Sequence, residues 1–270
     1  MKELLKRTLT GAVFVILMIT MIWWNIWSLS VLLLFILVAG MNEFFKLTLL
    51  QPRQKIIFWP ILSGTVVLLV VLFSRVERFP GIFILYASLL AVVSNLIILK
   101  FVSADFRRVI KPVFISFTYI LLPVCLTYYL ADYQKPVYNA WFLLLLFVLI
   151  WTYDSFAYLT GVLLGKHKIL PSVSPKKSWE GLFGGLIFTL LAAFLISLNF
   201  PDLLFYHWAG ISVIVVIAGT TGDFYESFLK RKAGVKDSGN LLPGHGGILD
   251  RFDSFLFISP VVYLYLCLIK

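Results

Sequence analysis

Long apolar stretches alternate with short polar ones along the whole chain. A helix needs about 17 to 25 mostly apolar residues to cross the hydrocarbon core of a bilayer. The stretches of that length, which we predict to be membrane-spanning helices, are 8–24, 28–50, 56–74, 80–100, 109–131, 139–164, 180–199, 207–229 and 249–269. The pattern therefore predicts an all-α fold, a polytopic transmembrane helix bundle of about nine helices.

The basic residues provide a check on this arrangement, because Lys and Arg are enriched in cytoplasmic loops. If the N-terminus is cytoplasmic, most of the 23 Lys and Arg residues fall in cytoplasmic segments. The exceptions are Arg75, Arg78, Lys135 and Lys270. A miscounted helix would mix the two sets, so we expect a cytoplasmic N-terminus. The two longest connections, 165–179 and 230–248, then both lie in the cytoplasm.

Composition agrees with a membrane protein, since 61% of the residues are hydrophobic and 13% are charged. The net charge of +10 does not indicate nucleic acid, because no polar segment is long enough to form a basic soluble domain. Anionic lipid headgroups and phosphorylated ligands are the expected partners. The basic N-terminus resembles a signal peptide, but no small-residue cleavage site follows, and we expect an uncleaved first helix.

No internal repeat or low-complexity linker divides the chain. We expect residues 1–131 to form a transmembrane scaffold that contacts lipid. Residues 139–270 are expected to carry the cytoplasmic catalytic loops between transmembrane helices.

The segment 227–253 combines basic residues, a glycine-rich turn and paired acids. Glycines allow backbone N–H groups to turn toward an anion, and a helix that begins near Ile248 would point its positive end at the same place. The candidate residues are Ser227, Lys230, Arg231, Lys236, Asp237, Gly244, His245, Gly246, Gly247, Asp250, Arg251 and Asp253. The pattern predicts a loop that cradles a polyphosphate.

Acidic residues stand on both sides of this loop. Asp250 and Asp253 are three residues apart and share a helix face, and Asp223 and Glu226 do the same on the preceding helix. Carboxylates together with substrate phosphates are the usual ligands of Mg²⁺. The alternative is that these acids only neutralise neighbouring basic residues such as Lys230.

Asp154 interrupts an apolar helix near its middle. A carboxylate at the centre of a bilayer costs roughly 2.5 to 3.5 kcal/mol on insertion scales, so it should face a polar cavity. Ser155 and Tyr158 could supply hydrogen bonds. A polar cluster that only packs helices together is the alternative.

The loop 172–181 carries hydroxyl groups and adjacent lysines, and its candidate phosphate-binding residues are Ser174, Lys176, Lys177 and Ser178. Paired lysines near a membrane are also common topology determinants. Ser178 is in addition a natural N-cap, with Glu180 in the first helical turn.

The sequence contains no P-loop, G-x-S-x-G elbow, H-E-x-x-H pair or CxxC set. The hydrolase and zinc-enzyme classes that depend on these motifs are therefore disfavoured.

The pattern Ser227-x-x-Lys-Arg-x4-Lys-Asp-x-Gly-x2-Leu-Pro-Gly-His-Gly-Gly-x-x-Asp-Arg-x-Asp253 resembles the signature of bacterial phosphatidate cytidylyltransferases, the CDP-diacylglycerol synthases. The segments 154–158 and 174–181 also resemble that family. The resemblance implies that CTP and phosphatidate react to give CDP-diacylglycerol and pyrophosphate. It also implies that the reaction requires Mg²⁺, and whether a second cation binds stays open. It also implies a homodimer in the bacterial inner membrane, with its active site on the cytoplasmic side.

The resemblance further implies roles for individual residues. Asp223 and Asp250 match metal-binding carboxylates, with Asp253 and Asp154 as further ligands or supporting groups. The group Lys230, Arg231 and Lys236 is expected to bind phosphates, and Arg251 is a further candidate catalytic residue. Lys176 and Lys177 could hold either CTP or the phosphatidate headgroup, and His245 could donate a hydrogen bond to departing pyrophosphate.

Two other functions stay open. A CTP-dependent polyprenol or dolichol kinase would also need a metal, basic residues and access to lipid. An anion transporter would use a midplane carboxylate, but it predicts polar motifs on both membrane faces. Here the motifs gather on one face, which favours an enzyme.

Overall fold

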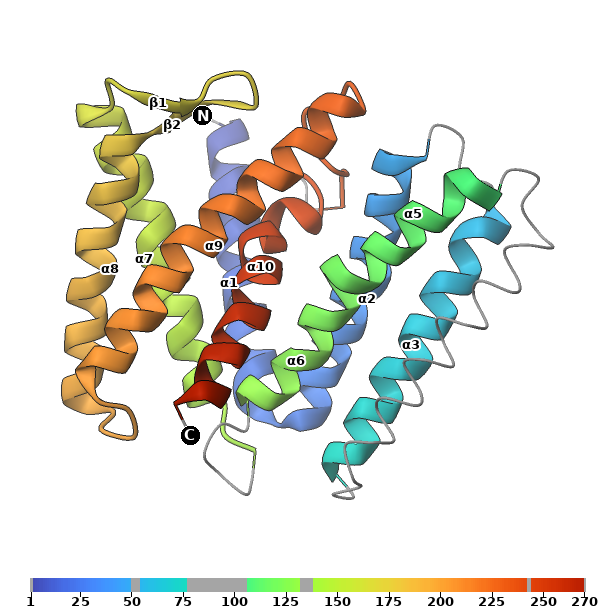
Figure 1. Cartoon of the computed structure of the whole chain (residues 1–270), viewed down its shortest axis with the longest axis horizontal. Coiled ribbons are helices and arrows are strands. Elements are labelled where there is room, and N and C mark those ends of the chain that lie inside the picture. Colours follow the sequence, from blue (N-terminus) through green and yellow to red (C-terminus); the bar gives the residue numbers. More distant parts are fainter. Residues whose placement is uncertain (1, 50–53, 77–105, 132–137, 242–243, 270) are drawn as a thin grey trace. The chain divides into compact units, whose positions relative to one another are not determined.

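The computed structural model describes residues 2–49, 54–76, 106–131, 138–241 and 244–269 (Figure 1). Its helices are α1 (Lys2–Trp24), α2 (Ile26–Thr48), α3 (Gln54–Val76), α5 (Phe106–Ser116), η1 (Phe117–Leu121), α6 (Leu122–Ala131), α7 (Trp141–Leu164), α8 (Trp179–Asn199), α9 (Phe205–Lys232) and α10 (Leu249–Leu268). The predicted helix at 80–100 lies outside the described residues. The total of nine helices therefore stays a prediction.

Six of the described helical segments are long and apolar enough to cross a membrane. They are Ile26–Thr48, Arg108–Ala131, Trp141–Leu164, Trp179–Asn199, Phe205–Lys232 and Leu249–Leu268. Two shorter apolar helical segments, Thr8–Trp24 and Phe58–Leu72, coincide with the first and third predicted spans. The chain is a multi-pass membrane protein.

The chain forms two compact units. Unit 1 comprises Met1–Ala140 and Lys232–Arg251. Unit 2 comprises Trp141–Arg231 and Phe252–Lys270. The glycine-rich loop of segment 227–253 thus belongs to the same unit as the N-terminal helices, although the sequence groups it with the C-terminal half.

Unit 1 contains a sharp reversal between α1 and α2. The Asn25 side chain accepts hydrogen bonds from the Trp27 and Ser28 amides at 2.9 Å, and the Ser28 hydroxyl accepts one from the Asn25 amide at 3.1 Å. This reciprocal cap allows a single residue, Asn25, to connect α1 to α2. Further along, the predicted helix 109–131 contains the π-helical turn η1, which ends two residues before Pro123, a residue without an N–H group for a regular helical bond.

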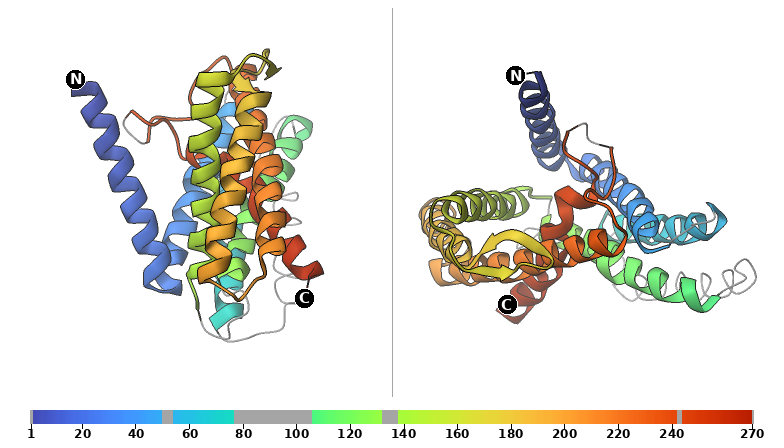
Figure 2. Two further views of the ribbon diagram at one scale, coloured as in Figure 1. Left: turned by 90° about the vertical axis from the view of Figure 1, so that its left-hand side faces the viewer. Right: turned by 90° about the horizontal axis from the view of Figure 1, so that it is seen from above.

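In unit 2, glycines allow α7 and α8 to pack closely (Figure 2). A Cβ atom at Gly181 would lie 2.7 Å from the Ala157 carbonyl oxygen, and one at Gly185 would lie 2.7 Å from the Tyr153 ring. The two glycines are four residues apart on α8, which is the spacing of small residues at close membrane-helix contacts.

A short β-hairpin precedes α8, and the all-α prediction does not contain it. β1 (Lys168–Leu170) pairs antiparallel with β2 (Ser174–Ser178), so that Lys168 faces Ser178. Pro175 disfavours a helix in this stretch because it lacks an N–H group and restricts the preceding residue to extended conformations. The hairpin covers one end of α7 and α8 in Figure 2.

Candidate active site

A pocket of about 580 Å³ opens in unit 2 beneath the hairpin, and we call it the hairpin pocket. Its polar lining residues are Tyr153, Asp154, Tyr158, Lys168, Ser174, Lys176, Lys177, Ser178, Thr220 and Asp223. Apolar side chains such as Val162, Ile169 and Leu182 form the rest of the wall. The size is that of a small-molecule site, and the lining combines cationic with apolar groups.

Asp154 lines this pocket from the middle of α7. The position agrees with the argument that a carboxylate inside an apolar helix needs a polar cavity. Tyr158, one turn further along α7, also lines the pocket, whereas Ser155 is not among its described lining residues.

Local hydrogen bonds hold the hairpin in place. The Ser178 hydroxyl accepts a bond from the Gly181 amide at 3.2 Å, which confirms the predicted N-cap of α8. Glu180, in the first turn of α8, accepts bonds from the His167 amide at 3.1 Å and ring Nδ1 at 2.6 Å. These contacts fix both ends of the hairpin and place Lys176 and Lys177 at the pocket.

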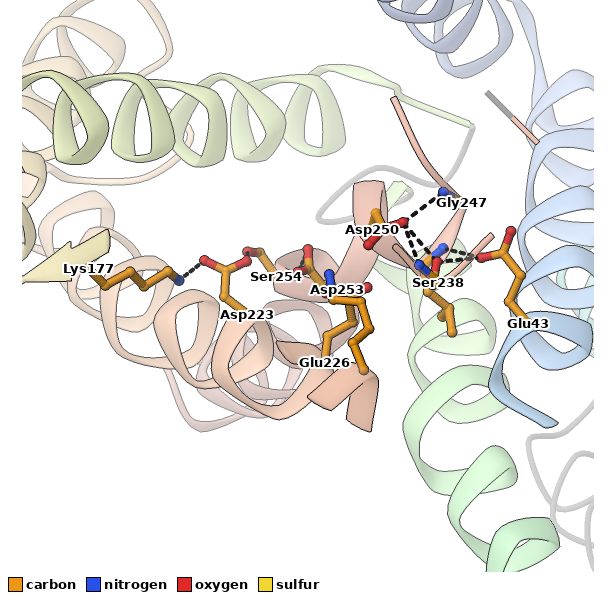
Figure 3. Close-up of polar contacts among 11 residues, drawn as sticks. Glu43, Lys177, Asp223, Glu226, Ser238, Gly247, Asp250, Asp253 and Ser254 are labelled. Atoms are coloured by element: carbon orange, nitrogen blue, oxygen red, sulfur yellow. Dashed lines mark hydrogen bonds and ion pairs between the residues drawn. The ribbon is translucent and has the colours of Figure 1, made fainter. Parts of the chain in front are cut away.

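A second feature of unit 2 is a group of charged side chains, with one serine, at the cytoplasmic boundary predicted for α9 and α10. We call it the acid–lysine cluster, and its members are Lys177, Asp223, Glu226, Lys230, Asp253 and Ser254 (Figure 3).

Lys177 reaches from the hairpin to form an ion pair with Asp223. The Asp223 carboxylate also accepts a hydrogen bond from the Ser254 hydroxyl at 2.9 Å. Its side chain is 23% exposed, and that of Lys177 is 28% exposed. Asp223 therefore joins the hairpin pocket to the acid–lysine cluster.

The approach of α9 to α10 brings further carboxyl groups together. A Cβ atom at Gly222 would overlap the Asp253 backbone carbonyl, so the two helices meet at this glycine. The Asp253 carboxyl group interacts with those of Asp223 and Glu226. The repulsion between such like charges is relieved by a cation or a shared proton.

The sequence predicts that Lys230 binds a phosphate. It forms an ion pair with Glu226 one turn earlier on α9, and the Glu226 side chain is 2% exposed. This pair is consistent with charge neutralisation, and phosphate binding by Lys230 stays a prediction.

The loop before α10 in unit 1 is organised by two carboxylates of the chain itself. We call it the capped loop, and it comprises Ser238, Gly239 and residues 244–250, with Glu43 of α2 against it (Figure 3). Gly244 and Gly246 have positive φ angles of 79° and 84°, which confirms their expected role in a turn.

Asp250 closes the capped loop from the first turn of α10. Its Oδ2 atom accepts hydrogen bonds from the Gly247 amide at 2.7 Å and from the Ser238 amide at 2.9 Å. Glu43 accepts bonds from the Ile248 and Leu249 amides at 3.0 Å and 2.9 Å. The amides at the start of α10, which we expected to face a polyphosphate, therefore donate to carboxylates of the protein.

His245 also has a partner in unit 1. Its ring Nδ1 lies 2.9 Å from the Thr10 hydroxyl, and a Cβ atom at Gly11 would lie 3.0 Å from its Nε2. The structure thus places His245 against α1, where it fastens the capped loop, and its predicted contact with pyrophosphate stays a prediction.

Several predicted residues lie at the surface. Arg231, Lys236, Asp237 and Arg251 are exposed, and Ser227 is half-buried on α9. Their roles in phosphate binding stay predictions.

The sequence interpretation missed Glu43, although a signal was present. Glu43 is a carboxylate inside the apolar stretch 28–50, and the argument that singled out Asp154 applies to it equally. In the structure it is 6% exposed.

The predicted metal ligands lie in different units, Asp223 in unit 2 and Asp250 in unit 1. Within the described ranges, no three His, Cys, Asp or Glu side chains gather as a metal site. The candidate metal-binding groups that interact with each other are the carboxyl groups of Asp223 and Asp253. Two carboxylates suit Mg²⁺, which commonly takes its other ligands from water and substrate phosphates.

The chain is similar to proteins named phosphatidate cytidylyltransferase. The relative from Bacillus subtilis (strain 168) is 41% identical over 157 residues, which are 57% of this chain and 58% of the relative. Relatives from Staphylococcus epidermidis (strain ATCC 35984) and Staphylococcus aureus (strain COL) are each 46% identical over 127 residues, 46% of this chain and 48% of theirs. The chain thus spans about half the length of these curated relatives.

A family model described as "Cytidylyltransferase family" matches residues 5–269. Because this match covers nearly every residue of the sequence and includes both units, the chain belongs to the cytidylyltransferase family.

Proposed function

We propose that this protein transfers the cytidylyl group of CTP to phosphatidate, which yields CDP-diacylglycerol and pyrophosphate. The observation that carries the proposal is the hairpin pocket, which Lys176, Lys177 and Asp223 line together with apolar residues of membrane-spanning helices. A lipid phosphate and a nucleotide phosphate both need such cationic groups, and only a lipid also needs the apolar wall. The family and the names of the relatives supply the two substrates.

The reaction needs charge neutralisation more than a strong base. A phosphate oxygen of phosphatidate attacks the α-phosphorus of CTP, the new P–O bond forms, and the bond to the β-phosphate bridging oxygen breaks. The nucleophile is already anionic, so catalysis depends on in-line positioning and on cations around the developing charge. Lys168, Lys176 and Lys177 all line the hairpin pocket, and we assign the neutralisation to Lys176 and Lys177 because Lys177 also pairs with Asp223.

Lys177 is held ready by Asp223. The ion pair orients the ammonium group, and the ring of Phe224 lies 5.1 Å from it. Lys176, its exposed neighbour on β2, has no such restraint among the described contacts. We propose that Lys177 neutralises a phosphate at a fixed position and that Lys176 attracts phosphates to the pocket.

We also propose Mg²⁺ as the cofactor, with Asp223 and Asp250 as its ligands and Asp253 in support. When bound, Mg²⁺ would neutralise charge on the CTP phosphates. The pair of interacting carboxyl groups on α9 and α10 supports a cation at Asp223, because their repulsion falls when a cation is present. A second cation stays open.

The location and assembly belong to the same proposal. The separation of basic residues supports a cytoplasmic N-terminus and an active site on the cytoplasmic side, where CTP is available. Similarity to bacterial proteins supports the inner membrane. The homodimer rests on the family resemblance alone.

The position of a label in CTP separates this function from its alternatives. The purified chain in phosphatidate-containing vesicles, with Mg²⁺, should move label from the α-phosphate of CTP into lipid and release γ-label as pyrophosphate. Transfer of γ-label into lipid would instead show a kinase. Movement of anions across the vesicle membrane without any lipid product would show a transporter.

A further inference from the structure

Glu43 is a buried carboxylate in a membrane-spanning helix whose partners are all distant in sequence. It is 6% exposed on α2, between the buried residues Met41 and Phe44. Its hydrogen bonds connect it to residues 195 to 206 positions further along the chain. A carboxylate is retained in such a place only when several donors replace its water.

Both oxygens of Glu43 are used. Oε1 accepts from the Ile248 amide at 3.0 Å, and Oε2 accepts from the Leu249 amide at 2.9 Å. These amides belong to the start of α10, where the helix itself provides no acceptors and its dipole favours a negative charge. Glu43 therefore caps a helix that is remote in sequence.

The capped loop is built to admit this side chain. A Cβ atom at Gly239 would lie 2.5 Å from Oε1 of Glu43, and one at Gly247 would overlap Oε2. Any other residue at either position would displace the carboxylate or the loop. The two glycines are thus needed for the Glu43 carboxylate to fit against the loop.

Ser238 connects Glu43 to Asp250. Its hydroxyl lies 2.9 Å from Oε2 of Glu43 and 3.0 Å from Oδ2 of Asp250. The hydroxyl carries a single hydrogen, so it donates to one carboxylate at a time. The Ser238 and Gly247 amides donate to the same Oδ2 atom, which fixes the orientation of the Asp250 carboxylate.

We infer that Glu43 is a positioning residue for the cytidylyl transfer reaction, acting through Ser238 and the α10 amides to hold Asp250 in its working orientation. The inference rests on the proposed function, in which Asp250 is a site residue. In this role Glu43 acts through other groups of the protein and not on a substrate. A displacement of about 1 Å at a reacting centre can cost about 100-fold in rate, so the loss of this support should be visible in kcat.

Glu43→Gln is the central test because it keeps the shape of the side chain. Glutamine has one acceptor oxygen, and its NH₂ group would face a backbone N–H or the Ser238 hydroxyl. In the full chain in detergent, we expect kcat to fall by about 10- to 100-fold while KM for phosphatidate changes less than about twofold. Amide hydrogen exchange in peptides containing Ile248 and Leu249 should become at least about tenfold faster.

Ser238→Ala provides a second variant that leaves both amide bonds to Glu43 in place. We expect it to lower kcat in the same direction without faster exchange at Ile248 and Leu249. Thr48→Val is the matched control, since Thr48 also lies on α2 and its hydroxyl donates, among the described contacts, to the Phe44 carbonyl of its own helix at 2.8 Å. Its kcat and exchange should match those of the unmodified chain.

Two results would overturn the inference. One is faster exchange in Glu43→Gln with unchanged kcat, which would make Glu43 a structural cap only. The other is lower kcat in Glu43→Gln with unchanged exchange at α10. If the unmodified chain makes no CDP-diacylglycerol, the proposed function fails instead, and hydrogen exchange alone still tests whether Glu43 caps α10.

Discussion

Asp223→Asn separates the chemical role of the acid–lysine cluster from its contribution to stability. Asparagine has the same shape, and its oxygen can still accept the hydrogen bond that Ser254 donates at 2.9 Å. The substitution removes the ion pair with Lys177 and also removes the repulsion between Asp223 and Asp253. These two changes oppose each other in the free energy of unfolding.

The magnitude follows from exposure. The two side chains of the ion pair are 28% and 23% exposed, so solvent screens part of their attraction, and such pairs contribute about 1 kcal/mol or less. The relief of like-charge repulsion at Asp253 offsets some of this loss. We expect the midpoint of thermal unfolding to change by no more than about 4 °C.

Activity should respond differently. If Asp223 binds the cation and holds Lys177, the variant loses interactions that stabilise charge in the transition state, each of which is typically worth about 10²- to 10³-fold in kcat. The assay measures label from α-labelled CTP in lipid and thermal unfolding on the same preparation. The control is Asp202→Asn, which removes an exposed acidic charge between α8 and α9. Near-normal lipid product from Asp223→Asn would contradict a chemical role for Asp223. Inactivity accompanied by a large loss of stability would contradict the separation of that role from stability.

Three further outcomes are expected. Lys177→Met should lower kcat/KM by about 100-fold or more through loss of a phosphate partner, whereas Lys166→Met, exposed just before the hairpin, should change it less than about twofold. His245→Ala and Thr10→Val should lower activity to a similar degree in the same assay if the contact between them only fastens the capped loop, and a much larger loss in His245→Ala would restore its role at pyrophosphate. Removal of divalent cations by a chelator should abolish formation of lipid product, and added Mg²⁺ should restore it, while activity that persists in excess chelator would argue against the proposed cofactor.

Features that depend on neighbouring residues could be predicted from the amino-acid sequence. Apolar length is a local property, so most of the described helices fall where the pattern predicted them. The N-cap at Ser178 depends on residues three positions apart, and it was predictable for the same reason. The cost of a charge in an apolar helix likewise indicated that Asp154 would face a cavity.

Tertiary structure decided which partner each polar group takes. The acids near Lys230 could serve a metal or a lysine, and packing assigned Glu226 to Lys230. The amides at the start of α10 could bind any anion, and the chain supplies Glu43 from about 200 residues away. The hairpin arises from a pairing of strands that are each too short to show a periodic pattern.

The difference has one physical cause. Helix formation and capping depend on a few adjacent residues, whereas the partner of a buried charge depends on which distant segment folds against it. Sequence patterns show that a charge such as Glu43 needs partners, because an unsolvated carboxylate is costly. Only the folded chain shows that those partners are the amides and hydroxyl of the loop that holds Asp250.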